Sequence, residues 1–248
     1  MMYPRYKNFK NLCSILPLGL LALIATSSHI SAADVTADKG VHLFILSGQS
    51  NMAGMNPKLS FIPTVETEFG KEHVIIVKDA KGAQPIRRWD KSWKTKTGQK
   101  EEVYGELYDR LMQKVTKAIK GRELESVTFV WMQGERDAKE NHADVYAQSF
   151  MSVVNQLQKD LGHDDINLVI GRLSDFSAPK RYADWDNIRQ IQVDLAEENP
   201  RAAWVDTDDL NNIINRKGKP ANDLHYTKEG YVILGQRFAE AAIDLIKN

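Results

Sequence analysis

The chain has 248 residues, of which 42% are apolar and 27% carry a charge. This apolar fraction is enough for a globular domain with a buried core, and it excludes intrinsic disorder. The 33 basic residues balance the 33 acidic ones, so no excess of positive charge favours nucleic acid or an anionic membrane surface. We therefore expect no nucleic-acid partner.

Residues 1–33 have the pattern of a cleaved export signal. Three basic residues precede an apolar run at 12–26, and small residues follow it up to Ala33. This order is typical of a signal peptide that is cut after Ala32 or Ala33. The run is shorter than the ~20 residues that a membrane-spanning helix needs, so we expect no stable membrane anchor. The mature protein is predicted to be exported, either to the periplasm or out of the cell.

The only cysteine, Cys13, lies within this signal. Its removal would leave a mature chain without thiols, which excludes disulfides, zinc–thiolate sites and a cysteine nucleophile. The histidines after the signal show no spacing typical of a zinc site. We therefore expect the protein to need no metal ion and no other cofactor.

After residue 33, short apolar segments alternate with segments of helical periodicity. The apolar segments, which indicate buried strands, lie at 41–47, 74–77, 126–132, 166–170 and 202–205. Apolar side chains recur every three to four residues, as in helices that bury one face, at 107–119, 146–157, 188–195 and 231–243. This alternation predicts an α/β protein, a three-layer α/β/α sandwich with a central parallel sheet. No linker is evident, so 34–248 is predicted to be one domain.

Polar groups that contain glycine follow the first three predicted strands, and a further polar group precedes the last predicted helix. They lie at 47–54, 79–86, 133–137 and 222–227. In a parallel α/β sheet, ligands bind outside the carboxyl ends of the strands. We therefore expect the four groups to meet at one edge of the sheet and to form an active site.

Ser50 and His225 are the candidate nucleophile and base. Ser50 lies between Gly48 and Gly54, where the first strand turns toward the next element, so its hydroxyl is expected beside free backbone N–H groups. Alternatively, Ser50 caps the start of a helix. A catalytic serine needs a base to accept its proton and a carboxylate to hold that base, and Asp223 stands two residues before His225.

The heptapeptide GQSNMAG at 48–54 resembles block I of the SGNH-type hydrolases, in the branch of the sialate O-acetylesterase-like and family 6 carbohydrate esterases. The resemblance continues through GAQPIRRW at 82–89, WMQGE at 131–135 and DLHYT at 223–227. Together these blocks run through nearly all of the chain after the signal. The resemblance implies a flavodoxin-like α/β/α sandwich, in agreement with the pattern of strands and helices.

The resemblance also implies roles for individual residues. Ser50 would be the nucleophile and His225 the general base. The backbone N–H groups of Ser50 and Gly82, with the side-chain amide of Gln133, would form the oxyanion hole that stabilises the transition state. Because it has no Cβ, Gly82 would let the backbone approach the acyl oxygen closely.

Two residues are candidates for the acid that supports the histidine. The family usually has its acid three residues before the histidine, but Asn222 stands at that position here and Asp223 is one residue further on. Side chains two residues apart on an extended segment point to the same side, so Asp223 can still reach His225. Glu135, in the QGE block, is the alternative acid.

The resemblance and the export signal predict a serine esterase that removes acetyl groups from an O-acetylated carbohydrate, either a xylan-type polysaccharide or a sialic acid. Trp89 could stack on a sugar ring, and Arg87 and Arg136 could contact an acidic sugar. The alternative function is non-catalytic carbohydrate binding on the same fold, because Asn222 stands where the family has its acid.

Overall fold

The computed structural model describes residues 40–99, 103–176, 180–214 and 218–248. The predicted signal peptide at 1–33 lies outside the described residues. Within these ranges, no helix is both long enough and apolar enough to span a membrane.

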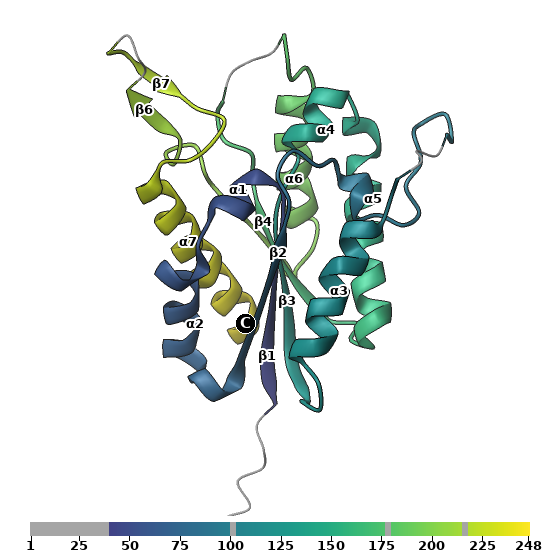
Figure 1. Cartoon of the computed structure of the whole chain (residues 1–248), viewed down its shortest axis with the longest axis vertical. Coiled ribbons are helices and arrows are strands. Elements are labelled where there is room, and N and C mark those ends of the chain that lie inside the picture. Colours follow the sequence, from purple (N-terminus) through teal and green to yellow (C-terminus); the bar gives the residue numbers. More distant parts are fainter. Residues whose placement is uncertain (1–39, 100–102, 177–179, 215–217) are drawn as a thin grey trace, which may run out of the picture. The chain divides into compact units, whose positions relative to one another are not determined.

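A five-stranded parallel sheet lies at the centre of the fold (Figure 1). Its strands are β1 (Val41–Gly48), β2 (Val74–Ala80), β3 (Leu124–Met132), β4 (Ile166–Gly171) and β5 (Ala202–Val205). Their order across the sheet is β2-β1-β3-β4-β5, and all neighbours are parallel. The chain passes from β1 to β2 on one side and then crosses to β3 on the other. Ligands bind at this kind of reversal in doubly wound sheets.

The register of the strands brings their carboxyl ends to one level. Gly48, the last residue of β1, pairs with Ala80 of β2 and with Met132 of β3. All eight residues of β1 are buried, because this strand lies inside the sheet and both of its faces are covered. The segments that follow β1, β2 and β3 therefore begin side by side.

Helices cover both faces of the sheet, and the predicted three-layer α/β/α sandwich is confirmed. The longer helices are α2 (Phe61–Phe69), α3 (Glu106–Ala118), α5 (Ala143–Leu161), α6 (Trp185–Glu197) and α7 (Lys228–Lys247). Figure 1 shows α2 and α7 on one side of the sheet and α3, α5 and α6 on the other. In α3, Leu107, Leu111 and Val115 are buried, because a spacing of four residues places them on one face of the helix.

Short elements complete the loops. They are α1 (Ser50–Gly54), α4 (Glu135–Glu140) and the 3-10 helices η1 (Pro57–Leu59), η2 (Lys71–His73) and η3 (Ile86–Arg88). Of these, α1, α4 and η3 follow the carboxyl ends of strands, whereas η2 directly precedes β2 at the opposite edge of the sheet. An antiparallel hairpin of β6 (Asn212–Ile214) and β7 (Pro220–Asn222) leads into the segment that contains His225. The hairpin was not predicted, because a strand of three residues is too short to show an apolar period.

Candidate active site

The turn after β1 places Ser50 at the carboxyl edge of the sheet. Gly48 has a φ of +142°, and a Cβ at this position would lie 2.0 Å from the carbonyl oxygen of Met132. Only glycine permits so close an approach of β1 to β3. The N–H of Gln49 donates to the same Met132 oxygen at 2.9 Å. Ser50, the first residue of α1, is thereby held half-buried beside the end of β3.

A pocket with a volume of about 350 Å³ opens next to Ser50. Its lining includes Gly82 from the loop after β2, Glu135 from the start of α4 and His225 from the loop before α7. A Cβ on Gly82 would lie 3.6 Å from the Cβ of Ser50, so the absent side chain leaves the space over the serine open. The pocket thus unites residues from all four of the polar groups predicted to meet at this edge.

The side-chain amide of Asn51 connects two parts of the pocket wall and the first turn of α7. Asn51 is only 1% exposed. Its Nδ2 donates to Oε1 of Glu135 at 3.0 Å and to the backbone oxygen of Leu224 at 3.2 Å. Its Oδ1 accepts a hydrogen bond from the hydroxyl of Tyr231 at 3.0 Å. Because Leu224 directly precedes His225, one amide holds both Glu135 and the segment that contains His225 beside the turn that contains Ser50.

The two candidate acids lie in different surroundings. Glu135 is 2% exposed, and burial raises its pKa from 4.5 to about 7. Its Oε2 is buried and has no hydrogen-bond partner among the described residues. Asp223 is exposed, and its Oδ1 accepts the N–H of Leu224 at 2.6 Å. Only Glu135 of the two lines the pocket together with His225.

Gln133 lies behind the pocket and is absent from its lining. The side chain is fully buried, and its Nε2 donates to Oδ2 of Asp137 at 2.5 Å, to the backbone oxygen of Gln84 at 3.1 Å and to Oε1 of Gln49 at 3.2 Å. The same Asp137 oxygen accepts the N–H of Ile86 at 2.9 Å. The amide of Gln133 thus ties the loop after β2 to α4 in this structure, whereas the predicted role in the oxyanion hole requires it to face the acyl group.

Comparison with known proteins identifies the family. The profile of the family described as carbohydrate esterase, sialic acid-specific acetylesterase, matches residues 53–244. The chain belongs to this family. A probable carbohydrate esterase of Arabidopsis thaliana is 26% identical over 212 residues, which cover 83% of this chain and 69% of the relative. The predicted enzyme class, a carbohydrate O-acetylesterase, is confirmed by this membership.

Solved structures share the fold of this carbohydrate esterase. The X-ray structure of a protein from Arabidopsis thaliana has a TM-score of 0.62 at 19% identity, over 83% of this chain and 99% of that one. A carbohydrate acetylesterase from Xanthomonas citri has a TM-score of 0.59 at 17% identity, over 84% of this chain and 56% of that one. These likenesses agree with the predicted SGNH-type sandwich.

Trp89, predicted to contact substrate, is a core residue of the esterase. Its side chain is fully buried, and its Nε1 donates to Oγ of Ser47 at 3.1 Å. The ring packs edge-on against Trp131, with 5.2 Å between the ring centroids. No face of Trp89 is left for a sugar, so the prediction of a stacking contact is wrong. Trp89 instead packs under the loop after β2, because burial of its large ring stabilises the core.

The two arginines predicted to contact an acidic sugar share one carboxylate. Arg136 lines the pocket, whereas Arg87 does not. The Nε of Arg136 lies 2.5 Å from Oε1 of Glu140, and Nη1 of Arg87 lies 2.6 Å from Oε2. Arg87 also lies over the ring of Trp93, 5.6 Å from its centroid. Arg87 is therefore a structural residue, contrary to the prediction, and Arg136 already has an acidic partner.

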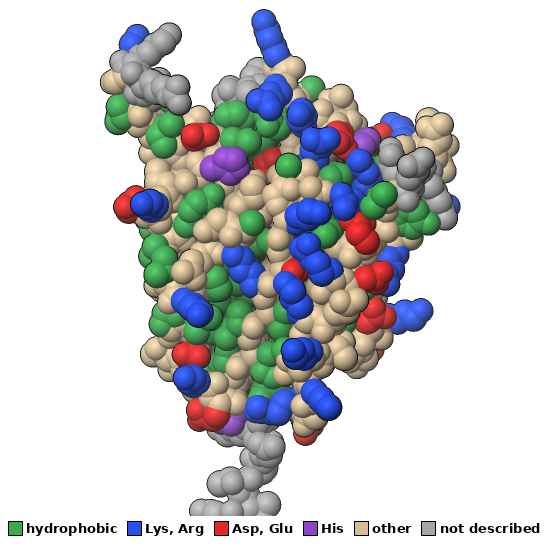
Figure 2. All heavy atoms as spheres, viewed as in Figure 1, with side chains coloured by type: hydrophobic (Ala, Val, Ile, Leu, Met, Phe, Trp, Pro, Cys, Tyr) green, Lys and Arg blue, Asp and Glu red, His purple; other side chains and the backbone are tan. Residues whose placement is uncertain are grey.

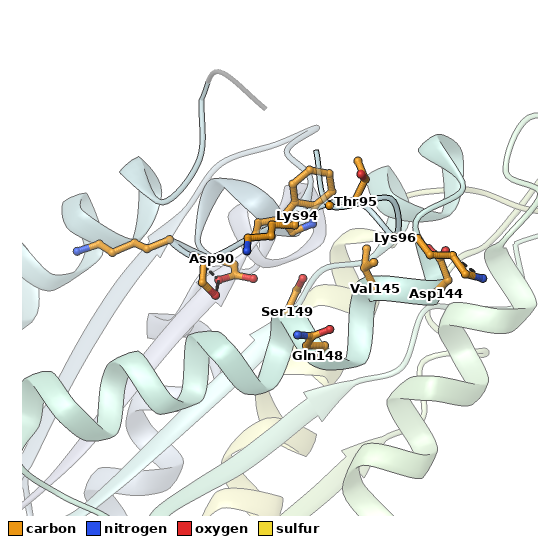
Figure 3. A pocket seen from close by; sticks show the side chains of 12 residues that line it. Asp90, Lys94, Thr95, Lys96, Asp144, Val145, Gln148 and Ser149 are labelled. Carbon is orange, nitrogen blue, oxygen red and sulfur yellow. Dashed lines mark hydrogen bonds and ion pairs between the residues drawn. The ribbon is translucent and has the colours of Figure 1, made fainter. Parts of the chain in front are cut away.

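A second and larger hollow, of about 690 Å³, lies between the loop that contains Asp90 and Lys94 and the first turns of α5 (Figure 3). It includes neither Ser50 nor His225. Within the described ranges, no group of three His, Cys, Asp or Glu side chains is placed to hold a metal ion. We place the candidate active site in the smaller pocket, because that pocket contains the candidate nucleophile, the candidate base and a buried carboxylate.

Sequence reasoning missed four residues at this site. Asn51 belongs to the GQSNMAG motif, which was the available signal for it. Lys139 stands four residues after Glu135, a spacing that places both on one face of α4. Arg181 and Tyr182 come from the loop between β4 and α6 and line the pocket. No pattern in the sequence distinguishes these last two from other loop residues.

Proposed function

We propose that this esterase removes O-acetyl groups from carbohydrates through an acyl-enzyme on Ser50, with His225 as the general base. One observation carries the proposal: Ser50 and His225 line one pocket, although 174 residues of sequence lie between them. Gly82 supports it, because its open position over Ser50 leaves room for an acyl group. The heptapeptide around Ser50 and the family membership give the same reaction class.

The reaction proceeds by two acyl transfers. His225 takes the proton of the Ser50 hydroxyl as its oxygen attacks the acetyl carbonyl, and the carbonyl electron pair moves onto the oxygen. The backbone N–H groups of Ser50 and Gly82 donate to this oxyanion. The C–O bond to the sugar then breaks, and the sugar alcohol leaves with the proton from His225. Water, deprotonated by His225, attacks the acyl-enzyme and releases acetate, which regenerates Ser50.

Glu135 is our proposed acid of the triad. Its buried carboxylate lines the pocket together with His225 and has one oxygen free to accept the imidazole N–H. Asp223 is exposed and uses one oxygen on its neighbour's N–H, so it would have to turn inward to serve. An ionised carboxylate stabilises the imidazolium that forms when Ser50 is deprotonated. Because the pKa of Glu135 is about 7, kcat/KM is expected to rise with pH up to about that value.

We propose an exported enzyme that acts on acetylated carbohydrate outside the cytoplasm, either xylan-type polysaccharide or an acetylated sialic acid. Residues 1–33 support export, since their basic start, apolar run and small residues before Ala33 are those of a cleaved signal. Acetate release from an acetylated xylan and from an acetylated sialic acid, compared at equal acetyl concentration, distinguishes the two substrate classes.

Hydrolysis of p-nitrophenyl acetate by the mature chain tests the catalytic assignment. Ser50→Ala is expected to abolish turnover with unchanged circular dichroism. Glu135→Gln keeps an oxygen for Asn51 but cannot ionise, and we expect a loss of about 10³- to 10⁴-fold in kcat by analogy with other triads. Asp223→Asn is the matched control and should stay within about threefold of wild type. A larger loss in Asp223→Asn would transfer the acid role to Asp223, and an inert wild type that still binds sugar would favour the non-catalytic alternative.

A further inference from the structure

Two basic side chains at the rim of the candidate active-site pocket have no acidic partner within the part of the chain that the structure describes. Lys139 and Arg181 both line the pocket and are exposed. Neither forms an ion pair with a carboxylate that the structure describes, whereas Arg136 in the same lining is bound to Glu140. Among the described residues, the lining therefore contains two positive charges without an ion-pair partner, and Glu135, which is buried, is its one carboxylate.

Several other basic residues of the described ranges are bound by carboxylates. Figure 2 shows Lys and Arg side chains gathered over the face that carries α3. On α3, Arg110 and Lys114 both bind the buried carboxylate of Asp79, and Lys91 pairs with Asp109. These three cations thus share two carboxylates, whereas Lys139 and Arg181 have no such contact among the described residues. Cations that line a concave site raise the local concentration of anionic ligands.

We propose that Lys139 and Arg181 bind a carboxylate of the acetylated carbohydrate, so that the enzyme prefers an acidic sugar such as a uronate. This inference rests on the proposed function, because it places the carboxylate in the pocket where Ser50 attacks the acetyl group. The guanidinium of Arg181 can bind both oxygens of a carboxylate, and the ammonium of Lys139 adds a point charge. The preference would be set by these two residues rather than by Arg87 and Arg136, which share Glu140.

The rest of the fold holds the two cations at the pocket. Lys139 lies on α4, one helical turn after Glu135. Arg181 lies over the ring of Tyr182, with 5.5 Å from its guanidinium carbon to the ring centroid. Tyr182 is buried and packs edge-on against Trp185 at 5.4 Å between centroids. Trp185 in turn donates its Nε1 to the backbone oxygen of Ser174 at 2.8 Å. The tyrosine that supports Arg181 is therefore fixed in the core.

A pair of substrates that differ only in charge tests this subsite. One substrate is the methyl glycoside of an O-acetylated glucuronic acid, and the other is the methyl glycoside of glucose with the acetyl group at the same position. They differ only in that the glucoside has a hydroxymethyl group in place of the carboxylate. The readout is the ratio of kcat/KM for the uronide to kcat/KM for the glucoside, measured with the mature chain. Lys139→Ala, Arg181→Ala and the double variant are compared with Lys94→Ala, which removes an exposed lysine from the second hollow.

Wild type is expected to favour the uronide. Each single variant should lower the ratio by about fivefold to tenfold, as expected for loss of a charge-assisted contact at a partly exposed site, and the double variant by more. Lys94→Ala should leave the ratio unchanged. Added salt should lower the ratio in wild type and much less in the double variant. The proposal is overturned if wild type shows no preference, or if the double variant keeps the wild-type ratio.

Failure of this inference can be told apart from failure of the proposed function. If both substrates are hydrolysed at similar rates and Ser50→Ala is inactive, the esterase assignment stands and the carboxylate subsite is refuted. If wild type hydrolyses neither substrate, the proposed reaction fails. In that case calorimetric titration with glucuronate and with glucose still decides the subsite. Tighter binding of glucuronate that is lost in the double variant supports it, and equal binding of both sugars overturns it.

Discussion

Replacement of Asn51 by alanine removes the side chain that connects the nucleophile turn to the rest of the pocket wall. The amide makes hydrogen bonds to Oε1 of Glu135, to the backbone oxygen of Leu224 and to the hydroxyl of Tyr231. After Asn51→Ala, the buried Glu135 carboxyl loses its side-chain hydrogen bond at Oε1. The Leu224 oxygen also loses a donor, so the backbone directly before His225 is no longer bound to the turn that contains Ser50, although Asp223 and Tyr226 keep their own hydrogen bonds.

The size of the effect follows from these three bonds. A net loss of about 1 kcal/mol for each hydrogen bond, with the added penalty for unpaired buried groups, gives a destabilisation of about 3–5 kcal/mol. A displacement of His225 by about 1 Å is enough to lower kcat by about 100-fold. Tyr231→Phe removes only one of the three bonds and should cost about 1 kcal/mol, with a smaller change in kcat.

Urea unfolding and hydrolysis of p-nitrophenyl acetate measure the two effects. Asn187→Ala is a matched control, because the amide of Asn187 is exposed and, among the described residues, donates to Asp184 at the start of its own helix. We expect the control to change stability by less than about 0.5 kcal/mol. If Asn51→Ala unfolds within about 1 kcal/mol of wild type and keeps kcat/KM within about threefold, the reasoning is refuted.

Three further predictions concern the turn at Gly48, the titration of Glu135 and the burial of Trp89. Gly48→Ala should abolish soluble expression or activity, since its Cβ would lie 2.0 Å from the Met132 oxygen. Gly98→Ala is the control, because a Cβ there meets nothing within 4 Å, and it should cost only about 1 kcal/mol of backbone strain. Burial raises the pKa of Glu135 to about 7 in the folded protein, so wild type loses stability as the pH rises through that value. The glutamine of Glu135→Gln cannot ionise, so the free energy of unfolding of this variant, measured with urea, should rise relative to that of wild type by about 2 kcal/mol between pH 5.5 and pH 8. A difference between the two proteins that does not change with pH would contradict this prediction. Trp89→Ala should lower the free energy of unfolding by about 3–5 kcal/mol, and stability equal to wild type would contradict its place in the core.

Several features of this protein follow from the sequence by itself. Apolar runs such as 41–47 and helical periods such as 107–119 predict the layers of the fold, because burial of one face or of both faces imposes a period on neighbouring residues. The GQSNMAG motif predicts the turn at Ser50 and the reaction class, since the residues that shape the turn are adjacent in the chain.

Only the tertiary structure decided how distant segments meet. Asn51 and Glu135 are 84 residues apart, and no local pattern reports their hydrogen bond. Asp223 stands only two residues before His225 in the sequence, yet its side chain is exposed. Glu135, which is far away in the sequence, lines the pocket together with His225. Trp89 is buried because the loop after β2 folds back onto the sheet. Propensity and period act over a few residues, whereas side-chain direction and partners are set by packing between segments that the sequence keeps far apart.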